Sequence, residues 1–184
     1  NSKEEYTKDS SVSGTTNPNG TVNVTLFKDE VQIASKSVTA NDKGNFNVNF
    51  DGLADGAYKA TATVKASNTE KSATVQFNLD TTPPGEFTSV ELKETETGIN
   101  VTWSPVKDAV NYQVLVKEGK DSDRYKSYLV EDKTSYLIEN VAYDTAYEVI
   151  VIALDRVGNK VQTEAKSIQT KPFIGGTVKG IVSN

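Results

Sequence analysis

Carboxylates and tyrosine hydroxyls are the main side chains of this sequence that could do chemistry. The chain contains no cysteine, histidine or methionine. It therefore offers no disulfide, no thiolate nucleophile and no histidine base, and a Cys- or His-based zinc site is excluded. It does contain 25 Asp and Glu residues and 8 tyrosines. These side chains could form an acid–base pair, bind a hard cation or contact a carbohydrate.

A paired-carboxylate active site needs two acids that flank a cleft, one of them with a raised pKa. Here most acids lie in turn sequences such as NDKG (41–44) and DGLADG (51–56). Solvent keeps the pKa of such carboxyls ordinary. Every connecting segment is short, so no insertion is available to build a cleft. We therefore expect no catalytic residues and no enzyme activity.

Charge and composition limit the partners and the location. A net charge of −5 argues against nucleic acid, because a phosphate-binding surface needs clustered Lys and Arg. The longest apolar run, VIVIAL (149–154), has strand length and is too short to span a bilayer, so no membrane insertion is expected. The absence of cysteine favours a bacterial surface protein over an animal ectodomain. A chain that opens on Asn1 is expected to be processed or cut from a larger protein.

Alternation of apolar and polar residues predicts strands throughout the first half of the chain. These predicted strands span 21–27, 31–38, 45–50, 57–66 and 72–79. Two further strands are expected at 4–7 and 10–15, and turn sequences separate all of them. Short strands at regular spacing indicate a sandwich or a barrel.

The second half shows the same alternation. Its predicted strands span 87–94, 98–104, 111–119, 125–131, 134–139, 146–154 and 160–170. Each half thus holds about seven strands in about 80–90 residues, the size of one immunoglobulin-like sandwich. The predicted fold class is all-β, with two seven-stranded Ig-like β-sandwiches in series.

The sequence DTTPPG (80–85) separates the two halves. Pro83 and Pro84 lack amide donors, so this stretch cannot lie within a central strand. Consecutive prolines favour polyproline II, which is extended and semi-rigid. We predict four segments: a sandwich over 1–80, a stiff linker over 81–84, a second sandwich over 85–171, and a tail or the start of a further β module over 172–184.

Three motifs in the second half point to a family. They are INVTWSPV with Trp103, NYQVLV from Asn111, and VAYDTAY followed by EVIVIALD, with Tyr147. With these motifs, residues 85–170 resemble a fibronectin type III domain. The resemblance implies a buried Trp103 and a tyrosine corner at Tyr147, whose hydroxyl bonds to nearby backbone. Tyr143 stands where the family often has proline, which implies a looser loop.

The first half carries SVSGTTNPNGTVNVTLF, GNFNVNF and LADGAYKATATV, and its closing strand runs into DTTPP. With this layout, residues 1–80 resemble a bacterial Ig-like module. The last residues, GGTVKGIVSN (175–184), resemble the opening strand of a carboxypeptidase-regulatory-like β domain. A frayed tail is the alternative for this segment.

Seven-stranded topology places acidic side chains from both halves near the linker. Calcium takes six to eight oxygen ligands from loops of this kind, and the resemblance implies that tandem bacterial Ig-like modules hold calcium at such joints. One prediction is therefore Ca²⁺ at the joint, with no other cofactor required. Its expected ligands are Asp29, Asp51, Asp80, Asp108 and Asp155. The alternative is a set of solvated acidic turns, because no dense D-x-D-x-D-G loop is present.

Alternation along 146–154 leaves three aliphatic side chains on the outer face, with a fourth on the neighbouring strand. These four are Leu115, Ile150, Ile152 and Leu154. They could form a patch that contacts a partner, although coverage by long Lys and Glu side chains is the favoured alternative. A carbohydrate platform would require Tyr125, Tyr128, Tyr136 and Tyr143 to cluster in space.

Because we expect no catalytic residues, the sequence favours a non-catalytic spacer or stalk. It would belong to a multidomain extracellular bacterial protein that is secreted or attached to the cell wall. Its partners would be the neighbouring domains of the same polypeptide, and the fragment is expected to be a monomer. Two alternatives stay open. The chain could be an adhesion module that binds a cell-surface glycan or protein, or a piece of a self-assembling surface layer.

Overall fold

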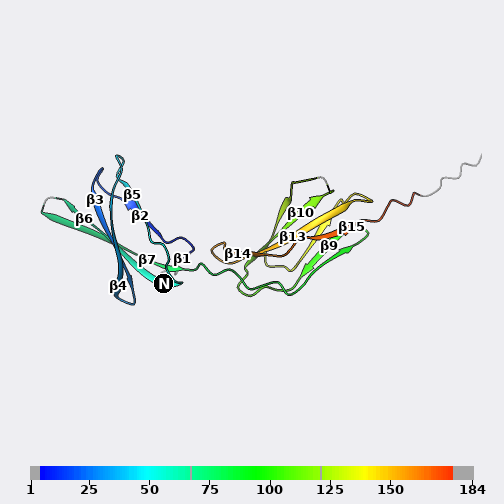
Figure 1. The fold of residues 1–184 in the computed structure, drawn as a ribbon, viewed down its shortest axis with the longest axis horizontal. Coiled ribbons are helices and arrows are strands. Elements are labelled where there is room, and N and C mark those ends of the chain that lie inside the picture. Colours follow the sequence, from blue (N-terminus) through cyan, green and yellow to red (C-terminus); the bar gives the residue numbers. More distant parts are fainter. Residues whose placement is uncertain (1–4, 67, 121, 176–184) are drawn as a thin grey trace, which may run out of the picture. The chain divides into compact units, whose positions relative to one another are not determined.

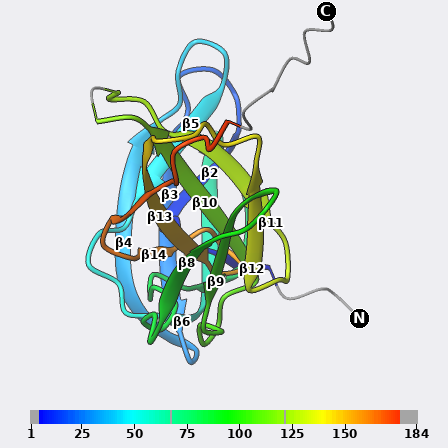
Figure 2. The same ribbon diagram turned by 90° about the vertical axis from the view of Figure 1, so that its right-hand side faces the viewer.

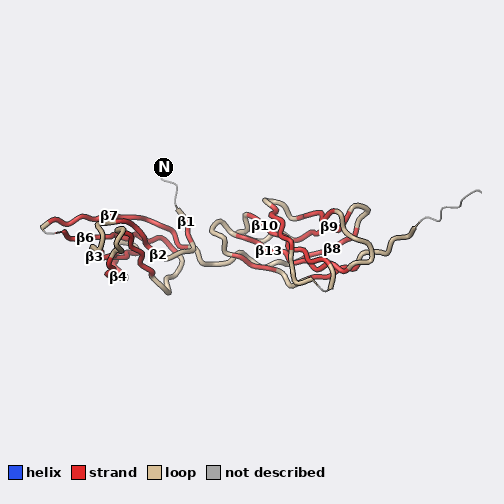
Figure 3. The backbone as a smooth tube through the Cα atoms, turned by 90° about the horizontal axis from the view of Figure 1, so that it is seen from above, coloured by secondary structure: helices blue, strands red, loops and turns tan. Residues whose placement is uncertain are grey.

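The computed structural model describes residues 5–66, 68–120 and 122–175, and strands are its regular elements (Figures 1 and 3). This confirms the predicted all-β class. The chain divides into two compact units. Unit 1 comprises Asn1–Thr82 and Val157–Asn159, and unit 2 comprises Pro83–Arg156 and Lys160–Asn184. Among the described residues, no helix has the length and apolar character to cross a membrane.

Unit 1 is a sandwich of one large and one small sheet. The large sheet has the order β1-β7-β6-β3-β4, with β1 (Tyr6–Thr7), β3 (Thr21–Lys28), β4 (Val31–Thr39), β6 (Gly56–Ala66) and β7 (Thr69–Leu79). The small sheet pairs β2 (Ser11–Thr15) with β5 (Asn45–Asn49). The pairing of β1 with β7 is parallel, and the other pairings are antiparallel.

The core of unit 1 follows from period-two alternation. Val22, Val24 and Leu26 occupy alternate positions of β3 and are fully buried. Tyr58 and Ala60 of the adjacent strand β6 lie in the same cluster. Burying an aliphatic side chain of this size contributes about 1.5–3 kcal/mol, so these alternate positions hold the two sheets together.

Unit 2 is a sandwich with a different division of strands. One sheet has the order β11-β10-β13-β14, and β15 also pairs with β13; the other has the order β12-β9-β8. Figure 2 shows β10, β11 and β13 side by side. The bounds are β8 (Val90–Glu94), β9 (Gly98–Trp103), β10 (Asn111–Glu118), β11 (Lys126–Val130), β12 (Ser135–Glu139), β13 (Ala146–Leu154), β14 (Lys160–Gln162) and β15 (Lys166–Gln169).

The prediction of one strand over 160–170 is wrong, because the segment forms β14 and β15. Gln162 pairs with Ile152 and Lys166 pairs with Val149, so three residues stand opposite two. This is the pattern of a β-bulge. The Thr163 hydroxyl accepts a hydrogen bond of 3.0 Å from the backbone N–H of Val151, in place of a backbone carbonyl.

The aromatic core of unit 2 confirms the placement of Trp103. Its side chain is 4% exposed, and its ring centroid lies 5.3 Å from that of Tyr112 at an interplanar angle of 57°. The Tyr112 hydroxyl accepts a hydrogen bond of 2.9 Å from the N–H of Val106. Tilted aromatic pairs of this kind stabilise a core beyond the area that they bury. A role for Trp103 in sugar stacking is therefore excluded by its burial.

Candidate functional site

Tyr147 pins the connection between β12 and β13. Its side chain is 4% exposed, and its hydroxyl accepts a hydrogen bond of 2.7 Å from the N–H of Ala142. This is the bond that the tyrosine corner requires, so the prediction is confirmed. Burial raises the pKa of this phenol. The bond from Ala142 lowers the pKa by a smaller amount, so the pKa is raised overall. The corner fixes a loop, and it offers no reactive group.

A second residue braces the same loop, and the sequence did not reveal it. The Thr170 hydroxyl donates to the Ala142 carbonyl at 2.7 Å and accepts from the N–H of Thr145 at 2.9 Å. Thr170 is 2% exposed. These bonds tie the loop to the end of the last strand, so the loop has substantial bracing although Tyr143 replaces proline.

The predicted metal ligands of unit 1 lie in turns at one end of that unit. Asp29 and Glu30 have φ values of 50° and 63° and form the two-residue turn between β3 and β4. Two successive residues with positive φ are the mark of a type I′ hairpin. Asp51 is exposed after β5. Asp80 follows β7, and its carboxylate accepts a 3.2 Å bond from the N–H of Thr82.

The predicted ligands of unit 2 also share one end of their unit. Asp108 has a φ of 66° in the turn between β9 and β10, and Asp155 directly follows β13 with an exposed fraction of 6%. The backbone N–H of Val110 donates to the Leu154 carbonyl, which joins the two loops. Within either unit, the described residues include no group of three or more acidic side chains that could hold a metal. The predicted calcium site takes ligands from both units, so it stays a prediction.

Asp55 has a role that its acidic turn sequence did not indicate. Its carboxylate accepts hydrogen bonds from the Thr81 hydroxyl at 2.6 Å, the Thr81 N–H at 2.8 Å and the Thr82 hydroxyl at 2.5 Å. These bonds, led by those from the Thr81 and Thr82 hydroxyls, lower the pKa of the carboxyl from 3.8 to about 2. Asp55 thereby holds the two residues that immediately precede Pro83.

This geometry predicts a pH-dependent contribution to stability. The pKa of Asp55 is lower in the folded chain, so its stabilising effect is fully present above about pH 4 and is lost as the pH falls through about 2. We expect Asp55→Asn to lower the free energy of unfolding of unit 1 by about 1 kcal/mol near neutral pH, since the site is exposed. Urea unfolding at several pH values measures this difference, which should vanish near pH 2. Asp51→Asn is the control, and a pH-independent difference would contradict the assignment.

The predicted partner face of unit 2 is only partly accessible. Leu115 lies opposite Ile150 on adjacent strands, and both are half-buried, as is Leu154. Ile152 is only 5% exposed, so this member of the predicted patch is not available to a partner. It sits between Gln113 of β10 and Gln162 of β14 in the register. Long side chains on both neighbouring strands can cover such a position.

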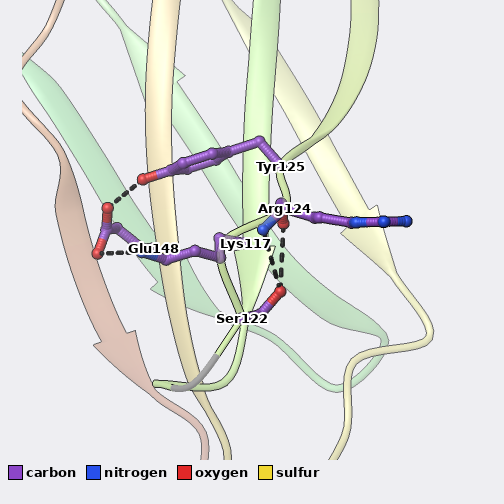
Figure 4. A network of polar contacts seen from close by, with 5 residues as sticks. All are labelled: Lys117, Ser122, Arg124, Tyr125 and Glu148. Atoms are coloured by element: carbon purple, nitrogen blue, oxygen red, sulfur yellow. Dashed lines mark hydrogen bonds and ion pairs between the residues drawn. The ribbon is translucent and has the colours of Figure 1, made fainter.

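A polar network borders that face (Figure 4). Glu148 of β13 accepts a hydrogen bond from the Tyr125 hydroxyl and lies 3.3 Å from the Lys117 ammonium. The bond from Tyr125 is the main reason why the pKa of Glu148 is lowered. The same bond is the main reason why the pKa of Tyr125 is raised. The Lys117 ammonium also lies 5.2 Å from the Tyr125 ring centroid. Lys117 and Glu148 are paired across β10 and β13, so the network braces two strands and a loop.

The four tyrosines proposed as a platform do not act together. Tyr128 and Tyr136 stack with centroids 5.1 Å apart, and both pack against the core. Tyr125 is engaged with Glu148, and Tyr143 is 63% exposed in another loop, where it contacts Phe173. The four rings therefore do not form one platform.

The two-sheet layout, buried tryptophan and tyrosine corner of unit 2 define an immunoglobulin-like β-sandwich. More specifically, residues 82–170 match the family model of the fibronectin type III domain. The features of unit 2 and this match together support the resemblance of this part of the chain to a fibronectin type III domain. No curated protein sequence matches the chain.

A solved structure supports the same fold. The crystal structure of the FN1-FN3 domains of chicken CNTN1 is similar with a TM-score of 0.67 and 18% identity, over 92% of this chain and 65% of that one. This chain thus spans less than two thirds of that structure, and the likeness concerns the fold alone. The FN5 domain of Drosophila Lar (25% identity, TM-score 0.42) matches over 50% of this chain and 99% of its own. A human contactin 1 fn3 domain (22%, 0.47) matches over 54% and 90%. The comparisons indicate no enzyme family.

Proposed function

We propose that the chain is a structural spacer in a multidomain extracellular protein, where two sandwiches hold neighbouring domains apart. Fibronectin type III domains typically occur in extracellular or surface proteins, which supports the location. A bacterial source, with a bacterial Ig-like module in unit 1, is part of the proposal. So is a secreted or wall-attached location.

The observation that carries the proposal is the bracing on either side of the two prolines. Asp55 holds Thr81 and Thr82 within unit 1. Within unit 2, the N–H of Gly85 donates to the Lys107 carbonyl at 2.9 Å. Only Pro83 and Pro84 lie between these anchors, and proline fixes φ near −65°. A linker with so few free dihedrals favours stiffness, which is the property that a spacer needs.

Small-angle scattering at a dilution where the chain is monomeric tests this function. We expect one elongated particle for the intact chain and a spread of bent shapes for Pro83→Gly/Pro84→Gly. Glu96→Gly/Thr97→Gly, in the turn between β8 and β9, is the matched control and should behave like the intact chain. An intact chain that samples many bent shapes would overturn the spacer function.

The same experiment with calcium or a chelator tests the predicted joint site. If calcium stiffens the intact chain but not the variant Asp80→Ala/Asp155→Ala, the joint binds the ion. If scattering does not respond to calcium, the five predicted ligands are wrong, and the prolines with the Asp55 bonds account for the stiffness.

A further inference from the structure

A cavity of about 730 Å³ opens at one end of unit 2. Residues of β10 and β11 line it from one sheet, and residues of β12 line it from the other. Its inner part is apolar, because Val116, Ile138 and Tyr147 are buried residues of the core. Val141, which packs against the same core, also lines it. A ligand in this cavity would therefore rest on the end of the hydrophobic core.

Two cations face the cavity from the start of β11. Tyr128 packs against the core, and alternation places Lys126 on the same side of the strand. Tyr125 turns to the opposite side, where its hydroxyl bonds to Glu148. Figure 4 shows the Arg124 side chain directed away from that bond. Both cations line the cavity, and neither forms an ion pair with a residue that the structure describes.

Two carboxylates line the same cavity from other strands. Burial is the main reason why the pKa of Tyr147 is raised, and the Glu118 carboxylate adds to this effect, which places it close to the phenol. Burial is also the main reason why the pKa of Tyr136 is raised, and the charges of Tyr128 and Glu139 add to it. Within the described part of the chain, neither carboxylate forms an ion pair. The cavity thus has two cations and two carboxylates that are not paired with one another.

The charges around the cavity indicate the kind of ligand that it can hold. A ligand with negative charge alone would be repelled by the two carboxylates, and one with positive charge alone by the two cations. A neutral ligand would take the charged groups partly out of water without offering them a partner. A ligand with a carboxylate at one end, an ammonium at the other and an apolar body between them matches all of these groups. A short peptide with free termini has this chemistry.

We propose that the cavity binds a short peptide through both of its free termini. The peptide carboxylate binds Lys126 and Arg124, whose planar guanidinium donates two parallel hydrogen bonds to it. The peptide ammonium faces Glu118 and Glu139. An apolar side chain of the peptide packs against the apolar residues of the cavity. All of these residues belong to unit 2, so the site goes beyond the spacer function and does not depend on it.

An NMR titration of the full chain with the tripeptide alanyl-leucyl-alanine tests the proposal. We expect binding in the millimolar range, as is usual for a ligand of this size, with shifts of the amide signals centred on the residues that line the cavity. Acetylation of the peptide N-terminus or amidation of its C-terminus removes one charge. Each should weaken binding about fivefold, the effect of one exposed ion pair.

Variants assign each terminus to its partner. Arg124→Gln should weaken binding of the free peptide about fivefold. It should not change binding of the amidated peptide, which has no terminal carboxylate. Glu118→Gln should weaken binding of the free peptide by a similar factor, but not binding of the acetylated peptide. Lys133→Gln and Glu131→Gln, in the turn that follows β11, are charge-matched controls and should change neither.

Three results would overturn the proposal. The absence of binding at concentrations well above the millimolar range excludes a peptide site. Equal binding of the free, acetylated and amidated peptides excludes recognition of the termini. Equal weakening by Arg124→Gln and Lys133→Gln shows that net charge, and not this cavity, attracts the peptide. The blocked peptides test the contacts on the unaltered chain, so the proposal can fail even where a variant does not fold.

Discussion

Replacing Trp103 with alanine is expected to lower the free energy of unfolding of unit 2 by about 3 kcal/mol. The side chain is 4% exposed and packs on Tyr112 in the centre of the sandwich, so its removal leaves a cavity between the sheets. Aromatic-to-alanine changes in cores cost about 3–5 kcal/mol. We place this one at the lower end, because Trp103 Nε1 has no hydrogen-bond partner among the described residues and its burial already costs stability.

The measurement is urea unfolding followed by circular dichroism and by NMR signals assigned to each unit. Only the transition of unit 2 should move, because the core cluster around Trp103 contains residues of that unit alone. Tyr143→Ala, at a position 63% exposed, is the control and should change stability by less than about 0.5 kcal/mol. An equal shift of both transitions would show that the units do not unfold separately.

Period-two alternation predicted the strands well, since it depends only on which side of the backbone each side chain faces. It predicted burial at some positions, such as Val22, Val24 and Leu26, and failed at others. Val31 and Ile33 are apolar residues of β4, yet they are 62% and 45% exposed. The register between β3 and β4 shifts here, and Ile33 falls between the paired residues Gln32 and Ala34. Nor could it place the bulge before Lys166, where the Thr163 hydroxyl accepts a bond from the opposite strand.

The division of strands between sheets was also beyond the sequence. Counting strands gives about seven for each half, but it does not show that β1 pairs in parallel with β7 and so joins the large sheet of unit 1. That choice rests on only two residues, Tyr6 and Thr7, whose alternation is equally compatible with either sheet. Long-range pairing, and not local pattern, decides it.

For the candidate sites, strand order correctly placed acidic residues at shared ends of each unit, but it could not assign their partners. Asp51 and Asp55 belong to the same turn sequence, and only Asp55 accepts bonds from Thr81 and Thr82. The pair Lys117 and Glu148 is likewise visible only once the register of β10 and β13 is known. Partners far apart in the sequence require the three-dimensional pairing.

Replacing Tyr147 with phenylalanine is expected to cost about 1 kcal/mol in unit 2, although it removes a single oxygen. The hydroxyl accepts a hydrogen bond of 2.7 Å from the Ala142 N–H. Ala142 itself is exposed, so losing this bond costs about 0.5–1.5 kcal/mol, and the unchanged ring volume adds no cavity term. Tyr143→Phe removes the same atom from an exposed ring and is the matched control.

Hydrogen exchange tests whether the Tyr147 hydroxyl fixes the loop between β12 and β13, or whether the residue contributes only through the packing of its ring. If the corner fixes the loop, the Ala142 amide should lose protection in Tyr147→Phe beyond the loss of global stability. The amide of Thr145, held by Thr170, should then keep most of its protection. If both amides change only as much as the global stability does, the hydroxyl adds stability but does not position the loop. If Tyr147→Phe and Tyr143→Phe lower the free energy of unfolding of unit 2 equally, the Tyr147 hydroxyl has no specific role in stability.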